Sequence, residues 1–378
     1  MIIRQARKYR IYPNREQRQK LAVQFGHARY VYNWGLAIRK EHFAQTGKGL
    51  TRFQTQKLLV GLKNEFPWLK KADSQALQVS LLHLDTAYKN FFQKRAGYPK
   101  FKSKHGKQSI RYPQRVKFSA THTYLPKVGW VKTVFHRSLV GTQKSVTVSK
   151  TKTGKYFASV LCEWEIDIPE NHNPSVGIDL GLSHFAILSN GERIDSPKYL
   201  RRTEKQLARA QRRLSRKQRG SANKSKARHR VAVLHERVAN QRKDFLHKLS
   251  ADVTSRFGLI GLEDLNVSGM VRNHRLAKSI SDSGWSMFVT FCGYKSAIRG
   301  GYLHQVDRFF PSSKTCSNCG YINSDLQLSD RGWVCPECSV ELDRDINAAV
   351  NILNQTTAGA AGSHACGDCV RPTEFLTQ

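Results

Sequence analysis

The apolar residues of the first hundred positions recur mostly at helical spacing. Asn14 and Gln17 have the spacing of a capping box ahead of Leu21, which predicts the start of a helix. A second amphipathic stretch spans residues 73–92. We therefore expect a helical bundle over residues 13–105, with these apolar stripes as its core.

The apolar spacing changes to a period of two over residues 111–168. The segments 145–149 and 156–161 alternate apolar and polar residues on either side of a short turn, which predicts a β-hairpin. We expect a small β-barrel or sandwich here, which also uses residues 1–11.

Strands and helices alternate after residues 168–174, which form the best linker candidate. The predicted elements are a strand over 176–181, a hairpin turn at Asn190–Gly191, a helical hairpin between Lys198 and Lys248, a strand over 259–263, a helix from Trp285, a strand over 302–306 and a helix over 346–353. This order of elements is the order of an RNase H-like fold.

Charge points to a polyanionic partner. The chain of 378 residues carries 63 Lys and Arg against 28 Asp and Glu, a net charge of +35 with a pI near 10.2. Such an excess cannot be neutralised within the fold and attracts phosphate groups. The segment from Lys198 to Lys248 holds eighteen Lys and Arg against three acids. It is either a solvated charged helix pair or, as we favour, a wall facing nucleic-acid phosphates.

The remaining composition predicts a cytoplasmic protein of several domains. The length suggests about two to four domains. No apolar run approaches the roughly 18 residues that a membrane span requires, and the first residues lack the apolar core of a signal peptide.

Four cysteines predict one structural zinc ion. Cys316, Cys319, Cys335 and Cys338 form two C-x-x-C pairs separated by fifteen residues, a spacing typical of zinc sites. The other cysteines suit a reducing cytosol. Cys366 and Cys369 form a third C-x-x-C pair, but no partner pair remains, so we favour two free thiols in a loose tail.

Three carboxylates are candidates for a magnesium site. Asp179 lies within one apolar strand, Glu263 ends another, and Asp345 begins the last helix. A carboxylate in a buried strand is costly unless it binds a cation or a partner. Two Mg²⁺ ions, or Mn²⁺, would suit these oxygen ligands and could hold the attacking and leaving oxygens of a phosphodiester. Taken singly, each acid could instead cap a turn, pair with a lysine or cap a helix.

Four motifs together resemble the TnpB family, which comprises transposon-encoded proteins similar to the compact type V CRISPR nucleases. They are residues 176–181 (VGIDLG), 260–265 (IGLEDL), 311–320 (PSSKTCSNCG) and 343–349 (DRDINAA). Weaker similarity at residues 8–14 and 367–372 extends the resemblance over essentially the whole chain.

The resemblance implies an RNA-guided endonuclease that cleaves double-stranded DNA next to a short flanking motif. It implies a multidomain α+β architecture, with a RuvC (RNase H-like) nuclease, a zinc-ribbon insertion and a β-barrel wedge domain carrying an inserted helical recognition lobe. The implied boundaries are a wedge at 1–12 and 106–168, a recognition lobe at 13–105, a linker at 169–174, a nuclease at 175–307 and 341–356, a zinc finger at 308–340 and a flexible tail at 357–378.

The resemblance also assigns site residues. Asp179, Glu263 and Asp345 match the three nuclease acids, with Asp264 and Asp343 as the neighbours most easily mistaken for them. Arg331 matches an arginine near the scissile phosphate. The implied partners are a guide RNA from the transposon end, bound by one protein monomer, and the target DNA.

Aromatic residues of the helical region are candidates for base stacking, namely Tyr30, Tyr32 and Trp34. Two other functions use the same fold. A catalytically idle regulator would bind nucleic acid without cutting it, but all three acids are present. A DNA transposase would use the same acids for strand transfer, and fold and acids alone do not separate these chemistries.

Overall fold

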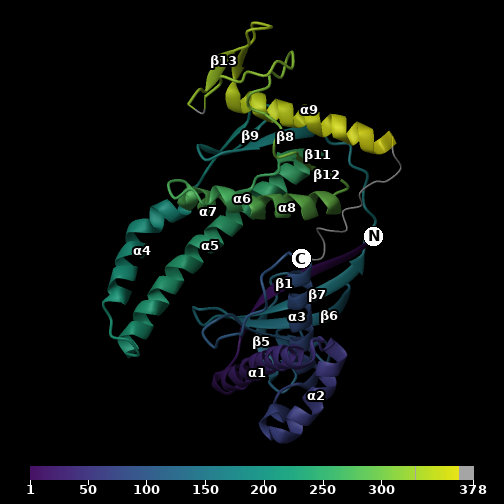
Figure 1. The fold of residues 1–378 in the computed structure, drawn as a ribbon, viewed down its shortest axis with the longest axis vertical. Helices are drawn as coiled ribbons and strands as arrows, with labels where there is room; N and C mark the ends of the chain where they lie inside the picture. Colours follow the sequence, from purple (N-terminus) through teal and green to yellow (C-terminus); the bar gives the residue numbers. More distant parts are fainter. Residues whose placement is uncertain (328, 366–378) are drawn as a thin grey trace. The chain divides into compact units, whose positions relative to one another are not determined.

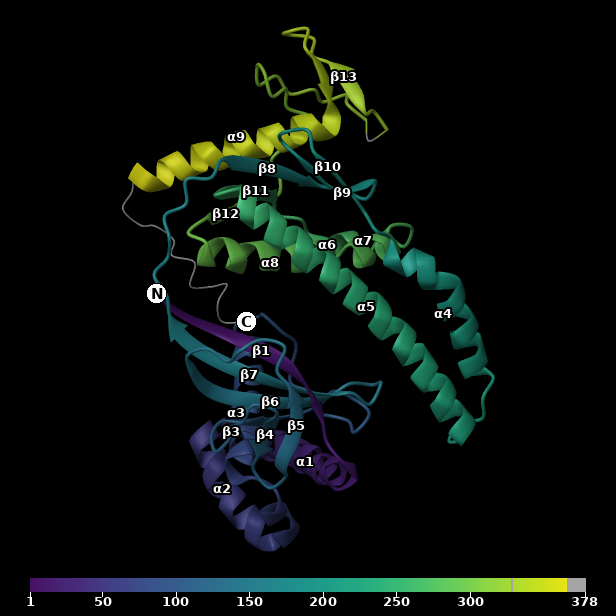
Figure 2. The same cartoon turned by 180° about the vertical axis from the view of Figure 1, so that it is seen from behind.

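A computed structural model of the chain describes residues 1–327 and 329–365 (Figures 1 and 2). They belong to two compact units, Met1–Ile166 and Asp167–Gln378. Cys366 and Cys369, on which we predicted free thiols, lie outside the described residues. Among the described residues, no helix combines the length and the apolar character that a membrane span requires.

The first unit contains one curled sheet of seven antiparallel strands. Its strands are β1 (Ile2–Tyr12), β2 (Gln108–Tyr112), β3 (Lys117–Phe118), β4 (His122–Leu125), β5 (Gly129–Val134), β6 (Thr142–Lys150) and β7 (Tyr156–Glu165), in the order β2-β6-β7-β1-β5-β4-β3. The predicted hairpin is confirmed as β6 and β7, and the N-terminal strand β1 joins the sheet between β7 and β5. No hydrogen-bonded pairing links the two edge strands β2 and β3 in this described sheet, so closure into a barrel stays a prediction.

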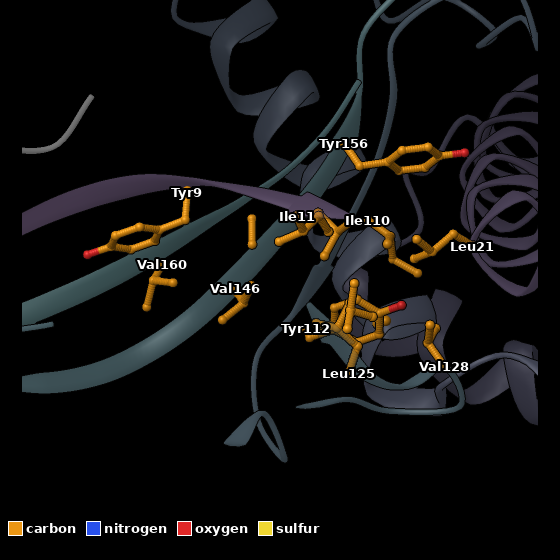
Figure 3. Close-up of a cluster of buried hydrophobic side chains, with 14 of the residues drawn as sticks. Tyr9, Ile11, Leu21, Ile110, Tyr112, Leu125, Val128, Val146, Tyr156 and Val160 are labelled. Atoms are coloured by element: carbon orange, nitrogen blue, oxygen red, sulfur yellow. The ribbon is translucent and has the colours of Figure 1, made fainter. Parts of the chain in front are cut away.

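One face of this sheet packs on the helices inserted after β1. Tyr9 and Ile11 of β1, Tyr112 of β2 and Val160 of β7 gather with Leu21 of the first helix (Figure 3). All five side chains are buried. The alternation of apolar residues in β1, β2 and β7 thus supplies the core that orders the sheet and the helices as one body.

The helices of this unit are α1 (Arg15–Thr46), α2 (Arg52–Glu65), the 3₁₀ helix η1 (Pro67–Lys71) and α3 (Ser74–Phe92). The predicted capping box of Asn14 and Gln17 begins α1, and Asp73 caps α3. The sequence did not lead us to predict α2, which begins with a second capping box, Thr51 with Gln54. Val31, Leu59 and Leu77 join these helices in a second buried cluster.

The second unit is built on a five-stranded mixed sheet. Its strands are β8 (Ser175–Leu180), β9 (His184–Leu188), β10 (Arg193–Asp195), β11 (Leu259–Glu263) and β12 (Tyr302–Val306), in the order β10-β9-β8-β11-β12. The strands β8, β11 and β12 are parallel, and β9 and β10 are antiparallel additions. The helices are α4 (Tyr199–Ser215), α5 (Ala222–Arg256), α6 (Val267–Met270), α7 (Ala277–Ser283), α8 (Trp285–Ile298) and α9 (Arg344–Ala365). The predicted order of elements is confirmed.

Helices cover both faces of this sheet (Figure 1). On one face, α5 and α8 bury Leu246, Val253 and Phe288 against strand residues such as Ile178 and Ile260. The helix α9 packs on the other face, against β8, β11 and β12. The helices α4 and α5 pair with each other, which confirms the predicted basic helical hairpin.

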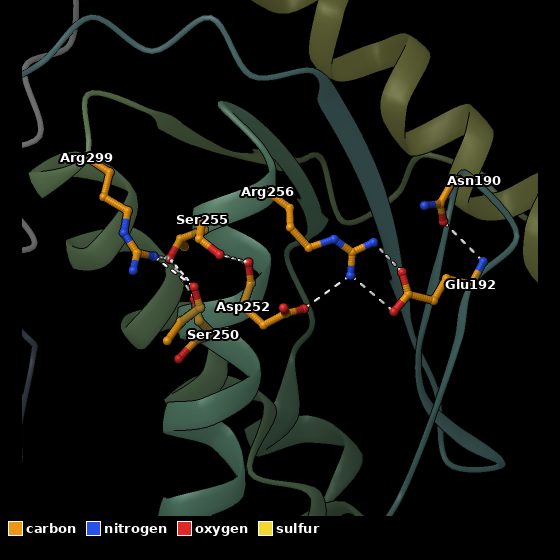
Figure 4. A network of polar contacts seen from close by, with 9 residues as sticks. Asn190, Glu192, Ser250, Asp252, Ser255, Arg256 and Arg299 are labelled. Atoms are coloured by element: carbon orange, nitrogen blue, oxygen red, sulfur yellow. Dashed lines mark hydrogen bonds and ion pairs between the residues drawn. The ribbon is translucent and has the colours of Figure 1, made fainter.

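A polar network fixes the C-terminal end of α5 (Figure 4). Arg256 forms a bidentate pair with Glu192 on the β9–β10 turn, at 2.5 and 3.2 Å, and reaches Asp252 at 3.1 Å. Hydrogen bonding from Arg256 lowers the pKa of Glu192. Arg299, which follows the last residue of α8, donates to the backbone oxygen of Ala251 at 2.8 Å. The network therefore ties the hairpin of the sheet, α5 and α8 together.

Candidate active site

Two glycines bring α9 directly onto the backbone of the sheet. Gly177 in β8 and Gly261 in β11 are paired in register, and both face α9. A Cβ atom at Gly177 would lie 2.0 Å from the backbone oxygen of Ala349, and one at Gly261 would lie 2.2 Å from Oγ1 of Thr356. Only glycine permits this close approach.

The acids follow these glycines by two residues. Since side chains in a strand alternate between faces, Asp179 lies on the face of Gly177, and Glu263 lies on the face of Gly261. Both strands are parallel, so both acids lie toward the same edge of the sheet. Asp345 lies in the first turn of α9, the helix that covers this face.

The three acids influence one another electrostatically. Desolvation, followed by the charges of Glu263 and Asp345, raises the pKa of Asp179 to about 7. The charge of Arg344 opposes this shift. Without a cation, the three carboxylates therefore repel one another at a partly desolvated position.

This arrangement fits hard divalent cations, which prefer oxygen ligands and would remove the repulsion. The four cysteines instead offer sulfur ligands, whose atoms all lie within 4.8 Å of one another.

Glu263 is held by a serine that we did not predict. The hydroxyl of Ser312, on the segment that follows β12, donates to the Glu263 carboxylate. Ser312 is itself buried, and its backbone oxygen accepts a hydrogen bond of 2.8 Å from the side chain of Asn351. A residue on α9 thus fixes the segment that orients the acid of β11.

A second asparagine on α9 fixes the same segment nearer the cysteines. Asn347 donates to the backbone oxygen of Thr315 at 2.7 Å and accepts from the backbone of Ser317 at 2.9 Å. Asn351 also donates to the oxygen of Thr315, at 2.6 Å. Both asparagines are buried. Their N-x-x-x-N spacing, one helical turn, was a signal in the sequence that we did not use.

The two neighbouring acids make other interactions. Asp343 accepts hydrogen bonds from the backbone of Asp345 and Ile346, at 3.1 and 3.0 Å, and pairs with Arg193 of β10 at 2.7 Å. It therefore caps α9 and ties it to the sheet. Asp264 pairs with Arg308. These contacts give Asp343 and Asp264 structural roles.

Arg331 lies beside one of the acids. Its guanidinium is 3.6 Å from the Asp345 carboxylate, and its side chain is 63% exposed. Its backbone oxygen accepts a hydrogen bond from the backbone of Arg344, which joins the cysteine-containing insertion to the start of α9. An exposed cation at this position is able to meet a phosphate group.

The four cysteines form a cluster with the geometry of a metal site. The Cys316 and Cys338 sulfurs are 3.6 Å apart, as are those of Cys319 and Cys335. Tetrahedral zinc with Zn–S bonds of about 2.3 Å requires S–S distances of about 3.8 Å. Hydrogen bonds from Asn318 and Val340 lower the pKa of Cys338 to about 6, whereas the pKa of Cys319 is raised to about 12 despite a hydrogen bond from Tyr321, so the thiolate that a metal needs forms first at Cys338.

Two similar turns present these thiols. Each C-x-x-C pair is followed by a residue in the left-handed conformation, Gly320 with φ of 83° and Ser339 with φ of 59°. The strands β13 (Gly332–Val334) and β14 (Glu341–Asp343) form the hairpin that carries the second pair and leads into α9. The cluster and Asp345 therefore share one continuous support.

One of the predicted stacking residues is not free to stack. Tyr32 is buried at 5% exposure, and the Lys102 ammonium lies 3.7 Å from the centre of its ring. The prediction that its face is available to a base is therefore wrong, because an apolar residue on the inner face of α1 is needed for packing. Tyr30 and Trp34 are only partly buried.

Three models of known protein families match parts of the chain. Residues 159–274 match the OrfB_IS605 model, described as a probable transposase, and residues 285–352 match the Cas12f1-like TNB domain. Residues 1–48 match a helix-turn-helix model, although here they form the strand β1 and the single helix α1.

Curated relatives extend over nearly the whole chain. A "Putative RNA-guided DNA endonuclease" of Streptomyces pristinaespiralis is 39% identical over 98% of this chain and 92% of its own length. InsQ of Escherichia coli, also named a "Putative RNA-guided DNA endonuclease", is 35% identical over 99% of this chain and 96% of its own. "TnpB-like protein L79" of Acanthamoeba polyphaga mimivirus is 34% identical over 32% of this chain and 24% of its own. The chain belongs to the TnpB family.

A solved structure has the same fold. The chain aligns with a Cas12f1 structure, entitled "Cryo-EM structure of the Cas12f1-sgRNA-target DNA complex", with a TM-score of 0.56 and 17% identity. The alignment covers 90% of this chain and 82% of the other. The mixed α/β architecture of Cas12f1 is therefore the architecture of this protein.

Proposed function

We propose that the protein is an RNA-guided DNA endonuclease of a transposable element, which cleaves double-stranded DNA next to a short flanking motif. The proposed cleavage is metal-dependent hydrolysis of a phosphodiester in a RuvC-like site. Asp179, Glu263 and Asp345 are the proposed ligands of two Mg²⁺ ions, which Mn²⁺ could replace. Membership of the TnpB family, whose curated relatives carry this activity in their names, supports the proposal.

One observation carries the assignment of the site. Two in-register strands each place a carboxylate two residues beyond a glycine, on the face that α9 covers with its own acid. Three acids from three separate elements have no structural purpose that requires them to be close, and the raised pKa of Asp179 reflects first its burial and then repulsion by the other two acids.

Different residues of the chain have different proposed roles in the reaction. Asp179, Glu263 and Asp345 would hold the cations, which when bound would activate water and stabilise the leaving 3′ oxygen, giving 5′-phosphate ends. Ser312 orients the Glu263 carboxylate, and Arg331 is the proposed contact to the scissile phosphate. One zinc ion held by Cys316, Cys319, Cys335 and Cys338 would order the insertion that carries Arg331.

The remaining parts have proposed roles in binding. The sheet of residues 1–12 and 106–168 is the proposed wedge, residues 13–105 the proposed recognition lobe, and the α4–α5 hairpin a proposed phosphate-facing wall. One protein monomer would bind one guide RNA. Base pairing would then specify the target, while the protein holds the RNA–DNA duplex by its backbone.

The test uses protein co-expressed with RNA from the transposon end. RNA should copurify, and a changed guide segment should move the cut to the matching DNA. If RNA-free protein cuts specific DNA equally well, or if a changed guide leaves the cut in place, strand transfer by a transposase becomes the better explanation.

A set of single variants tests the acids in the same assay. Asp179→Ala, Glu263→Ala and Asp345→Ala should each abolish cleavage while RNA and DNA binding remain, because most binding energy comes from phosphates. Asp264→Asn is the matched control, since its side chain pairs with Arg308. Wild-type cleavage by Asp345→Ala would show that the assignment of this acid is wrong.

A further inference from the structure

Two adjacent concavities of the first unit have complementary chemistry. One is a groove of about 560 Å³, whose lining includes the aromatic residues Tyr30, Trp34, Trp68 and Phe101. The other is a narrower cavity of about 190 Å³ between α1, α3 and the segment that leads into β2. Arg29 lines both of them.

The cavity is strongly cationic. Arg29, Lys102, Lys107 and Arg111 line it, and none of its lining residues, all within the described chain, is acidic. Desolvation, followed by the charges of Lys102, Arg111 and Lys107, lowers the pKa of His83 to about 4, although part of the imidazole remains exposed. Gathered cations without a counter-charge favour an anionic ligand.

The groove is preorganised for a flat apolar ligand. The ring of Trp68 lies 5.0 Å from Tyr30 and 4.7 Å from His27, which hold it in place, and it remains 37% exposed. Phe101 is 57% exposed at the same groove. Exposed rings held by neighbouring rings form a platform for stacking.

One short segment links the two sites. Asn33 of α1 exchanges two hydrogen bonds with the backbone of Lys102, at 2.8 and 2.9 Å. This anchors consecutive residues so that Phe101 lines the groove and Lys102 lines the cavity. Arg29 bridges them, with one nitrogen on Gln108 and the other beside Gly26.

We infer that the groove and the cavity together bind one unpaired nucleotide of the RNA, with its base in the groove and its phosphate in the cavity. The aromatic and cationic sites lie side by side, as the two ends of a nucleotide require. RNA is the favoured source because its loops and bulges present unpaired bases, whereas the bases of duplex DNA are stacked. The identity of this partner rests on the proposed function, but nucleotide binding itself does not.

The glycine in the groove allows a test that removes no side chain. A Cβ at Gly26 meets only Arg29, at 3.9 Å, so Gly26→Leu would fill the groove without displacing the backbone. Gly61→Leu is the matched control, because this glycine also lies within a helix and has nothing within 4 Å. Lys107→Gln removes a cation from the cavity, and Lys104→Gln removes one from the same segment outside it.

The first measurement uses full-length protein expressed without its RNA. Adenosine and uridine 5′-monophosphates, the free nucleosides and inorganic phosphate are titrated by calorimetry. We expect the monophosphates to bind best. Gly26→Leu should weaken their binding about tenfold and leave the binding of inorganic phosphate unchanged. Lys107→Gln should weaken the binding of the monophosphates and of inorganic phosphate alike. Equal binding by these variants and their controls would overturn the nucleotide site.

The second measurement uses the purified complex with RNA. Chemical probing of the bound RNA should reveal one unpaired nucleotide that becomes reactive in Gly26→Leu and not in Gly61→Leu. If the change appears instead in a DNA strand of the target complex, or in no nucleotide, RNA is not the occupant. If no RNA copurifies, the proposed function fails while the titrations still decide the nucleotide site.

Discussion

At the residue scale, the position of Glu263 depends on a single hydroxyl. Ser312 donates to its carboxylate and is itself anchored by Asn351 of α9. A carboxylate held by a second residue is already oriented when a cation arrives, so less conformational freedom is lost on binding.

Ser312→Ala should therefore lower the cleavage rate by about 10- to 100-fold, the usual effect of removing a residue that orients a metal ligand. The concentration of Mg²⁺ that gives half-maximal cleavage should rise, while RNA binding stays unchanged. Ser313→Ala is the control, since this neighbouring side chain is less buried. Equal rates for the two variants would show that the hydroxyl has no part in orienting Glu263.

Ser339 offers a second prediction at this scale, because it occupies a conformation that favours glycine. Its φ of 59° matches the φ of 83° at Gly320 in the equivalent turn. Left-handed geometry costs a non-glycine residue about 1–2 kcal/mol. Ser339→Gly should strengthen zinc retention in a chelator competition by up to about fivefold, or ~1 kcal/mol. Gly320→Ser should weaken zinc retention. Weaker zinc retention by the Ser339→Gly variant would contradict the prediction.

At the element scale, the packing of α9 on β8 aligns the site. The helix approaches so closely that the atoms nearest to Gly177 belong to the backbone of α9 and not to its side chains. The same approach brings the first turn of α9, with Asp345, over the acids of the strands. The stability of the protein and the alignment of the three acids therefore depend on the same contact.

Gly177→Ala should destabilise the protein by about 3 kcal/mol, the upper range for overpacking, because the nearest atoms are backbone and cannot rotate away. Cleavage should fall even where the protein remains folded. Gly332→Ala is the control, since a Cβ there meets only the Leu342 oxygen at 3.6 Å. Urea unfolding gives the free energies, and equal midpoints for both variants would disprove this account of the packing.

At the scale of the whole molecule, local patterns predicted the elements better than their contacts. The capping box at Asn14, the β6–β7 hairpin and the basic helical hairpin followed from spacing alone. Spacing cannot reveal that Tyr32 faces the core, since both faces of α1 carry aromatic residues. The hydrogen bonds of Ser312 with Glu263 and with Asn351 join residues 49 and 39 positions apart, so no local pattern in the sequence predicts them.

Net charge acts at this same scale, and the α4–α5 hairpin concentrates it. Arg212, Arg213 and Arg216 are exposed near the end of α4. Each phosphate contact lowers the slope of log K against log salt by about 0.7 for single strands and about 0.9 for duplex DNA. Changing all three arginines to glutamine should therefore make the slope for nucleic-acid binding less negative by about 2–3 units. The corresponding lysine variant keeps the charge and should keep the slope. An unchanged slope in the glutamine variant would mean that these residues are a solvated surface and not a phosphate-facing wall.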